Sequence, residues 1–148
     1  MTTLHERIET ALPLADAFEL IADFSNAPGW DPGVATSRRL DGSPLGVGAR
    51  FRLGVRMAGR VVPMEYVITT WQPPCRVVLA GSGSGVTATD DIRFEATPSG
   101  TRIDYTADIR LRGLLRLVTP FAGGAFARIA RDARDGMQRT LDRRAAAD

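Results

Sequence analysis

The stretch Arg50-Phe51-Arg52-Leu53-Gly54-Val55-Arg56-Met57 decides the fold class. Its odd-numbered positions are apolar, and its even-numbered positions are mostly arginine. Neighbouring side chains of an extended strand point to opposite faces, so this alternation predicts a strand with one buried face and one face in water. The same period of two recurs over residues 34–111. The middle of the chain is therefore predicted to form a half-buried β-sheet.

Short turn sequences separate these strands. Each break is rich in glycine, proline, serine or aspartate, at residues 41–44, 58–59, 72–74, 81–85 and 98–100. Residues of this kind favour tight turns, and tight turns connect antiparallel neighbours. We expect an antiparallel meander of about six strands, with residues 4–10 adding an opening strand.

Helical spacing appears on both sides of the sheet region. After Pro13, apolar residues recur at helical intervals as far as Asp23 or Phe24, and a second short helical turn is expected in the proline-rich segment that follows. From Thr119-Pro120 onward, apolar residues recur every four positions, at Phe121, Ala125, Ile129, Ala133, Met137 and Leu141. The pattern predicts an α+β fold in which about seven antiparallel strands curve around a long C-terminal helix, as a single domain over residues 1–148.

Composition limits the function classes. The chain has 148 residues, of which 44% are hydrophobic and 24% charged, and its 19 basic residues, all arginine, are interleaved with 17 acidic ones. This mixed pattern argues against nucleic-acid binding. The N-terminal sequence MTTLHERIET lacks the apolar core of a signal peptide, and no run of about 18 apolar residues occurs, so we expect a cytoplasmic protein without stable membrane insertion.

The order of these elements carries a family resemblance. Ile21-Ala22-Asp23-Phe24 leads into Pro28-Gly29-Trp30-Asp31-Pro32, and the segments at residues 46–51, 70–74 and 100–101 follow at similar spacing. Together they resemble the START-like (SRPBCC) superfamily with its helix-grip fold, and within it the polyketide cyclase/dehydrase and lipid-transport-like proteins. The resemblance implies a deep apolar pocket beneath the long helix. It does not imply one reaction, because members include carriers and cyclases.

The first hypothesis is therefore a container for an apolar or aromatic small molecule, such as a lipid, a polyketide or a polycyclic compound. Such pockets usually enclose roughly 300–1,000 Å³. Trp30 lies in a segment that cannot form a regular helix or an inner strand, so it is interpreted either as a core plug or as a contact at the rim of the pocket. The other predicted wall residues are Phe51, Leu53, Val55, Met64, Tyr66, Ile92, Phe94, Tyr105, Phe121, Ala125 and Ile129.

An enzymatic alternative rests on acidic residues that share a face with apolar neighbours. Asp90 alternates with Ala88 and Ile92, and Glu6 with Leu4 and Ile8, while Tyr66 and Tyr105 also point inward. A carboxyl group in an apolar pocket keeps its proton more readily, which suits a general acid or base of a polyketide cyclase or dehydratase. In the competing interpretation, each carboxylate lies at a strand end, in water or paired with an arginine.

Other chemistries have little support in the sequence. His5 is the only histidine and Cys75 the only cysteine, so neither a metal site nor a cofactor is expected. Gly81-Ser82-Gly83-Ser84-Gly85 lacks the lysine of a phosphate loop and has strand pattern on both sides. A third hypothesis, a protein-interaction module, needs a contiguous exposed apolar patch, and the charged outer face of the sheet argues against it. Homodimerisation stays open.

Overall fold

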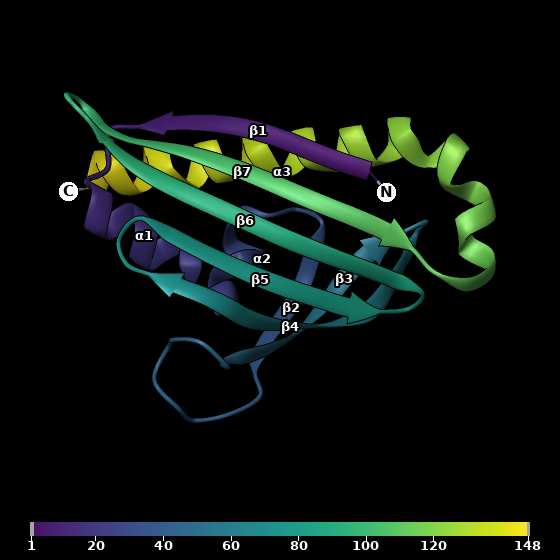
Figure 1. Cartoon of the computed structure of the whole chain (residues 1–148). Coiled ribbons are helices and arrows are strands. Elements are labelled where there is room, and N and C mark those ends of the chain that lie inside the picture. The colour runs from purple at the N-terminus through teal and green to yellow at the C-terminus, as the bar shows by residue number, and fades with distance from the viewer. Residues whose placement is uncertain (1, 148) are drawn as a thin grey trace.

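A computed structural model describes residues 2–147, and its elements follow the predicted order (Figure 1). Seven strands, three α-helices and two short 3₁₀ helices are described: β1 Thr2–Thr10, α1 Leu14–Ala22, η1 Phe24–Asn26, α2 Ala27–Trp30, β2 Val34–Arg39, β3 Arg50–Met57, β4 Arg60–Gln72, β5 Arg76–Gly83, β6 Val86–Thr97, β7 Gly100–Leu111, η2 Gly113–Val118 and α3 Thr119–Ala147. The predicted α+β class, the seven strands and the long C-terminal helix are confirmed.

All seven strands form one antiparallel sheet in the order β1-β7-β6-β5-β4-β3-β2. Strands β2 to β7 are the predicted meander, and β1 adds to its end beside β7. Register shifts between Val34 and Thr36 and between Ile68 and Thr70 mark bulges, which bend a sheet and increase its twist. The sheet therefore curves, and α3 runs along β1 (Figure 1).

One end of the inner face is closed by α1 and η1. The ring of Phe18 lies edge-on to Phe94 and to Trp71, each with centroids 5.1 Å apart. Phe24 packs on Phe51, with centroids 6.3 Å apart. These aromatic contacts fill the space between helix and sheet at this end, so the space under α3 lies at the other end.

The first two positions of the predicted stripe on α3 do not face the sheet. Met137 and Leu141 are buried, whereas Phe121 is 85% exposed and Ala125 is also exposed. A step of four residues turns an α-helix about 40° past a full turn, so the five steps from Phe121 to Leu141 add about 200°. The expectation that Phe121 and Ala125 face the sheet is therefore wrong, because a strict four-residue spacing cannot follow one side of a long helix.

The second half of α3 is held closely against α2. A side chain at Gly136 would collide with the carbonyl oxygen of Trp30 and would lie 2.8 Å from Cδ of Pro32. Thr140 Oγ1 donates a hydrogen bond of 3.0 Å to the carbonyl of Gly29. This contact fixes the helix over the sheet. None of the helices described within residues 2–147 is long and apolar enough to cross a membrane.

Candidate ligand-binding cavity

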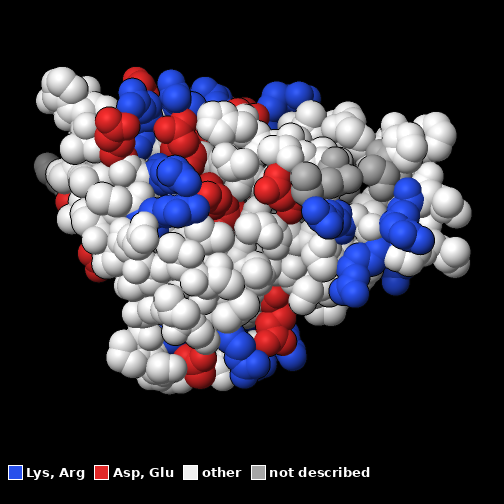
Figure 2. All heavy atoms as spheres, viewed as in Figure 1, with Lys and Arg blue, Asp and Glu red and all other residues white. Residues whose placement is uncertain are grey.

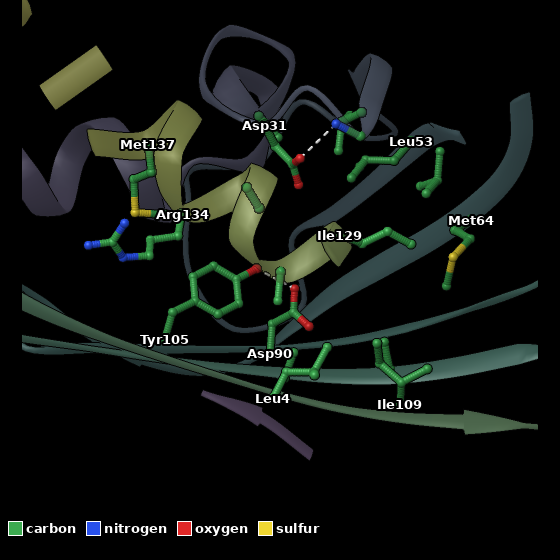
Figure 3. A pocket seen from close by; sticks show the side chains of 18 of the residues that line it. Leu4, Asp31, Leu53, Met64, Asp90, Tyr105, Ile109, Ile129, Arg134 and Met137 are labelled. Atoms are coloured by element: carbon green, nitrogen blue, oxygen red, sulfur yellow. Dashed lines mark hydrogen bonds between the residues drawn. The ribbon is translucent and has the colours of Figure 1, made fainter. Parts of the chain in front are cut away.

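A cavity of about 160 Å³ lies between the inner face of the sheet and α3 (Figure 3). Every strand except β5 supplies lining residues from the sheet, and η1, α2 and α3 supply the helical ones. Leu53, Met64, Ile109 and Ile129 are among the apolar side chains that line it. The alternation of the strands puts these side chains on the inner face, as the period of two predicts.

Asp90 and Tyr105 form a hydrogen-bonded pair inside this apolar cavity. The Tyr105 hydroxyl donates to Oδ2 of Asp90 over 2.6 Å, and Asp90 is only 7% exposed (Figure 3). Burial raises the pKa of Asp90 to about 7, although the hydrogen bond from Tyr105 opposes the rise and the nearby Asp31 adds to it. At neutral pH the carboxyl group is therefore divided between its protonated and ionised forms, so it can take up or release a proton.

Two tyrosines stay protonated beside Asp90. Burial raises the pKa of Tyr105 well above its usual value of 10.0, and the negative charge of Asp90 raises it further. Burial likewise raises the pKa of Tyr66, with Asp90 and Asp31 contributing. Both hydroxyl groups are hydrogen-bond donors at neutral pH rather than phenolates.

Asp31 is a second carboxyl group on the cavity wall, and sequence reasoning missed it as a site residue. Burial raises its pKa, while the hydrogen bond of 2.8 Å from the Gly33 backbone lowers it and the charge of Asp132 raises it (Figure 3). It lies in a loop, where strand or helix periodicity gives no indication of direction. Its position next to Trp30 was the only signal available.

Glu6 has a different environment from Asp90. It lies on the cavity wall, but its Oε2 is 3.7 Å from Nε of Arg134 on α3, and its side chain is 27% exposed. The sequence left two interpretations open for each acid. Glu6 follows the one in which the carboxylate is paired with an arginine, whereas Asp90 is a buried carboxyl group in the apolar cavity, hydrogen-bonded to a tyrosine.

Trp30 is a buried wall residue. It ends α2, is 3% exposed, and its ring lies edge-on to Tyr105 at 6.3 Å and to Phe24 at 6.1 Å. Its indole Nε1 is buried without a hydrogen-bond acceptor among the described residues. A buried indole N–H usually has an acceptor, so the unpaired donor of Trp30, a residue that lines the cavity, is unusual. Trp30 therefore closes the core and borders the cavity at once.

The structure brings only part of the predicted wall together. On the cavity lie Trp30, Leu53, Val55, Met64, Tyr66, Tyr105 and Ile129, together with Asp90 and Glu6. Phe51, Ile92 and Phe94 also point inward, but they are packed in the core away from the cavity because α1 and η1 cover that end of the sheet. Phe121 and Ala125 lie outside, on the exposed side of α3.

The helix residues that do face the cavity follow a mixed spacing. Phe126, Ala130, Ala133 and Met137 line it at intervals of four, three and four residues, together with Arg134. This alternation of three and four keeps to one side of an α-helix. The sequence contains this mixed spacing. Arg134 follows Ala130 by four residues, so the same spacing could have identified it as a cavity residue.

The remaining candidates lie elsewhere. His5 Nε2 is 3.4 Å from Asp104, and Cys75 is exposed. Within residues 2–147, no group of three or more histidine, cysteine, aspartate or glutamate side chains is placed to hold a metal ion.

Comparison with known families decides the classification. The sequence model described as polyketide cyclase/dehydrase and lipid transport matches residues 1–142. The chain belongs to this family. A comparison with curated protein sequences finds no match. Membership supports a role in binding hydrophobic small molecules, in agreement with the apolar cavity.

Solved structures of this fold are similar over nearly their whole length. The Zhui aromatase/cyclase from a Streptomyces species has a TM-score of 0.78 and 13% identity, covering 98% of this chain and 93% of that one. A START superfamily protein from Mycobacterium smegmatis has a TM-score of 0.75 and 15% identity, with 98% and 97% covered. A protein from Thermus thermophilus has a TM-score of 0.77 and 14% identity, with 99% of each chain covered. At these identities the likeness establishes the START-like fold.

Proposed function

We propose that this member of the family binds a compact apolar or aromatic molecule in the cavity under α3. The observation that carries the proposal is a mostly apolar cavity that contains one hydrogen-bonded carboxyl–hydroxyl pair, Asp90 and Tyr105. Apolar surface removed from water supplies about 25 cal/mol per Å² toward binding. The few polar groups then orient the ligand, with Tyr66 and the unpaired N–H of Trp30 as further donors to an oxygen of the ligand.

The size of the cavity limits the ligand. Its volume of about 160 Å³ is smaller than most ligand pockets, and an apolar cavity of roughly 150 Å³ accommodates benzene. A single ring fits the protein in this conformation. A lipid, a polyketide or a polycyclic compound requires the first half of α3 to move away from the sheet.

The first half of α3 is suited to such a movement. No described side chain between residues 120 and 135 is fully buried, so few contacts hold this half in place. Gly123 and Gly124 lie within it, and each glycine weakens a helix by about 1 kcal/mol relative to alanine. The second half stays attached through Gly136 and Thr140.

Filling the cavity is expected to abolish binding. Ala133 lines the cavity, and in Ala133→Phe the added ring occupies much of the space of about 160 Å³. We expect toluene to bind the wild type and to bind this variant at least about tenfold more weakly, since the lost contact area is worth more than about 1.4 kcal/mol. Isothermal titration calorimetry measures both affinities.

The matched control is Ala125→Phe, on the same helix but facing solvent. It is expected to bind toluene as the wild type does. Equal affinity of the wild type and Ala133→Phe would exclude this cavity as the binding site. Absence of binding by the wild type for toluene and for larger apolar compounds would contradict the container function itself.

A polyketide cyclase or dehydratase is the second candidate, and the proton affinity of Asp90 favours it. With a pKa of about 7, the carboxylate can remove a proton from a carbon between two carbonyl groups of a poly-β-ketone. The carbanion then forms a carbon–carbon bond with another carbonyl carbon. This bond closes the ring and turns the attacked carbonyl oxygen into an alkoxide, which takes the proton back from Asp90. Loss of that hydroxyl together with a proton from the adjacent carbon, as water, then leaves a carbon–carbon double bond in the ring. Tyr66, which lines the cavity and stays protonated, would donate a hydrogen bond to a carbonyl oxygen during these steps.

Asp90→Asn separates catalysis from binding. The amide keeps the size and can still accept the Tyr105 hydrogen bond, but it cannot take up a proton, so we expect ligand affinity within about threefold and turnover reduced by at least about 100-fold. In the wild type the rate should rise with pH around an apparent pKa near 7. If the wild type converts no poly-β-ketone, or if Asp90→Asn keeps the wild-type rate, the enzymatic candidate is wrong and the container function stands.

A further inference from the structure

The end of the molecule formed by η2 and the start of α3 exposes several large apolar side chains. Leu114 is 86% exposed, Leu117 73% and Phe121 85%, and Leu115 and Val118 are about half exposed beside them. Figure 1 shows this segment projecting beyond the end of β7. We call residues 112–121 the apolar tip. Contiguous exposed apolar surface of this kind marks an interaction site rather than a core.

The charged side chains in and next to the apolar tip along the chain are all positive. No aspartate or glutamate occurs from Ile109 to Arg131. Arg112, Arg116, Arg128 and Arg131 are exposed on this part of the chain, although the whole protein has a net charge of only +2. Figure 2 shows white and blue spheres at this end and no red ones. The tip therefore combines apolar side chains with a local excess of positive charge.

Two of these arginines border a shallow hollow beside the exposed leucines. It is lined by Arg110, Arg112 and Arg116 together with Thr87 and Gly113. Guanidinium groups around a hollow are suited to bind phosphate, because their N–H donors match its oxygen atoms.

The tip is attached firmly enough to hold these side chains outward. The Arg112 backbone N–H donates a hydrogen bond of 2.7 Å to the carbonyl of Gly85 in the β5–β6 turn. A side chain at Gly85 would lie 2.6 Å from Cδ1 of Leu115, which shows how closely Leu115 covers this turn. Leu114 and Leu117 consequently project from an anchored segment, and Phe121 follows them at the start of α3.

We propose that the apolar tip docks on the surface of an anionic lipid bilayer. Leu114, Leu117 and Phe121 would enter the boundary between headgroups and acyl chains, while Arg112 and Arg116 pair with lipid phosphates. Charge complementarity favours this occupant over a symmetric dimer, because two copies meeting tip to tip would place arginines against arginines. Phe126 on the cavity wall follows Phe121 by about 7.5 Å along α3, so docking brings the cavity close to the lipid.

Vesicle flotation with the full chain tests the proposal. We expect the wild type to float with vesicles of phosphatidylcholine mixed with phosphatidylglycerol, and much less with phosphatidylcholine alone. Arg112→Gln/Arg116→Gln is expected to weaken binding about 30-fold, since each arginine near an anionic surface contributes about a factor of five. Leu114→Ser/Leu117→Ser/Phe121→Ser is expected to weaken it about 100-fold. High salt should weaken the wild type as well.

The matched control is Arg38→Gln/Arg52→Gln, which removes the same charge from the exposed face of β2 and β3. It should float like the wild type, and all variants should keep the wild-type unfolding midpoint and toluene affinity. As a second measurement, brominated acyl chains should quench a larger share of the tryptophan fluorescence of Phe121→Trp than of the wild type, which already contains Trp30 and Trp71. No flotation of the wild type, equal loss in the control, or a dimer that the serine variant dissociates would each overturn the proposal.

Discussion

Asp90→Asn is expected to stabilise the protein at pH 8 by about 4 kcal/mol and to change its stability little below about pH 4. The pKa of Asp90 rises from its usual value of 3.8 to about 7 in the native state, and each unit corresponds to about 1.36 kcal/mol. Burial is the main cause of this rise in pKa, and the charge of Asp31 adds to it. Asparagine resembles the protonated acid, so the variant avoids the cost of an ionised buried carboxylate.

The direction in which stability changes with pH follows from proton binding by Asp90. The native state holds the Asp90 proton more tightly than the unfolded chain does, so stability is lost as the pH rises from about 4 to about 7 and stays low above that range. Urea unfolding of the wild type and of Asp90→Asn over this range gives the difference, in which the other titrating groups largely cancel. Parallel curves for the two proteins would show that Asp90 is not a buried acid with a raised pKa.

Gly136→Ala is expected to destabilise the protein by about 2–3 kcal/mol, although glycine to alanine within a helix usually stabilises by roughly 0.5–1 kcal/mol. The added methyl group would collide with the backbone of Trp30 and with the ring of Pro32, and neither can rotate away. The collision would push α3 away from α2 at the point where the helix is held over the sheet. Ligand affinity should fall with stability, because Trp30 borders the cavity.

Gly124→Ala is the matched control for this prediction. It lies on the same helix, and nothing lies within 4 Å of a side chain added there. We expect it to stabilise by up to about 1 kcal/mol, the ordinary helix effect. Urea unfolding of both variants measures the two free energies. If both variants changed the free energy of unfolding in the same direction, α3 would not approach α2 as closely as described.

The sequence predicted which way the strand residues point, but not what covers them. Ala88, Asp90, Ile92 and Phe94 all lie on the inner face of β6, as their alternation predicts. Only Ala88 and Asp90 reach the cavity, because Phe18 of α1 covers Phe94. Periodicity determines the face of a strand, whereas the position of a distant helix along that strand depends on tertiary packing.

Helix and loop residues were harder to place, for two different reasons. Phe121 was assigned to the cavity because a four-residue spacing was extended over too many turns of α3. Asp31 was missed because a loop has no period from which a direction follows. The pair of Asp90 and Tyr105 was the most accessible part of the site, because both lie on neighbouring strands whose inner faces the sequence identifies.

The most direct test of the container function is a methyl nuclear magnetic resonance titration of the protein with isotope-labelled methionine methyl groups. Met57, Met64 and Met137 all line the cavity, from two strands and from α3. Addition of toluene is predicted to shift the signals of all three through the ring current of the bound molecule, and these shifts should disappear in Ala133→Phe. Unchanged signals in the wild type, or identical shifts in Ala133→Phe, would contradict binding between the sheet and α3.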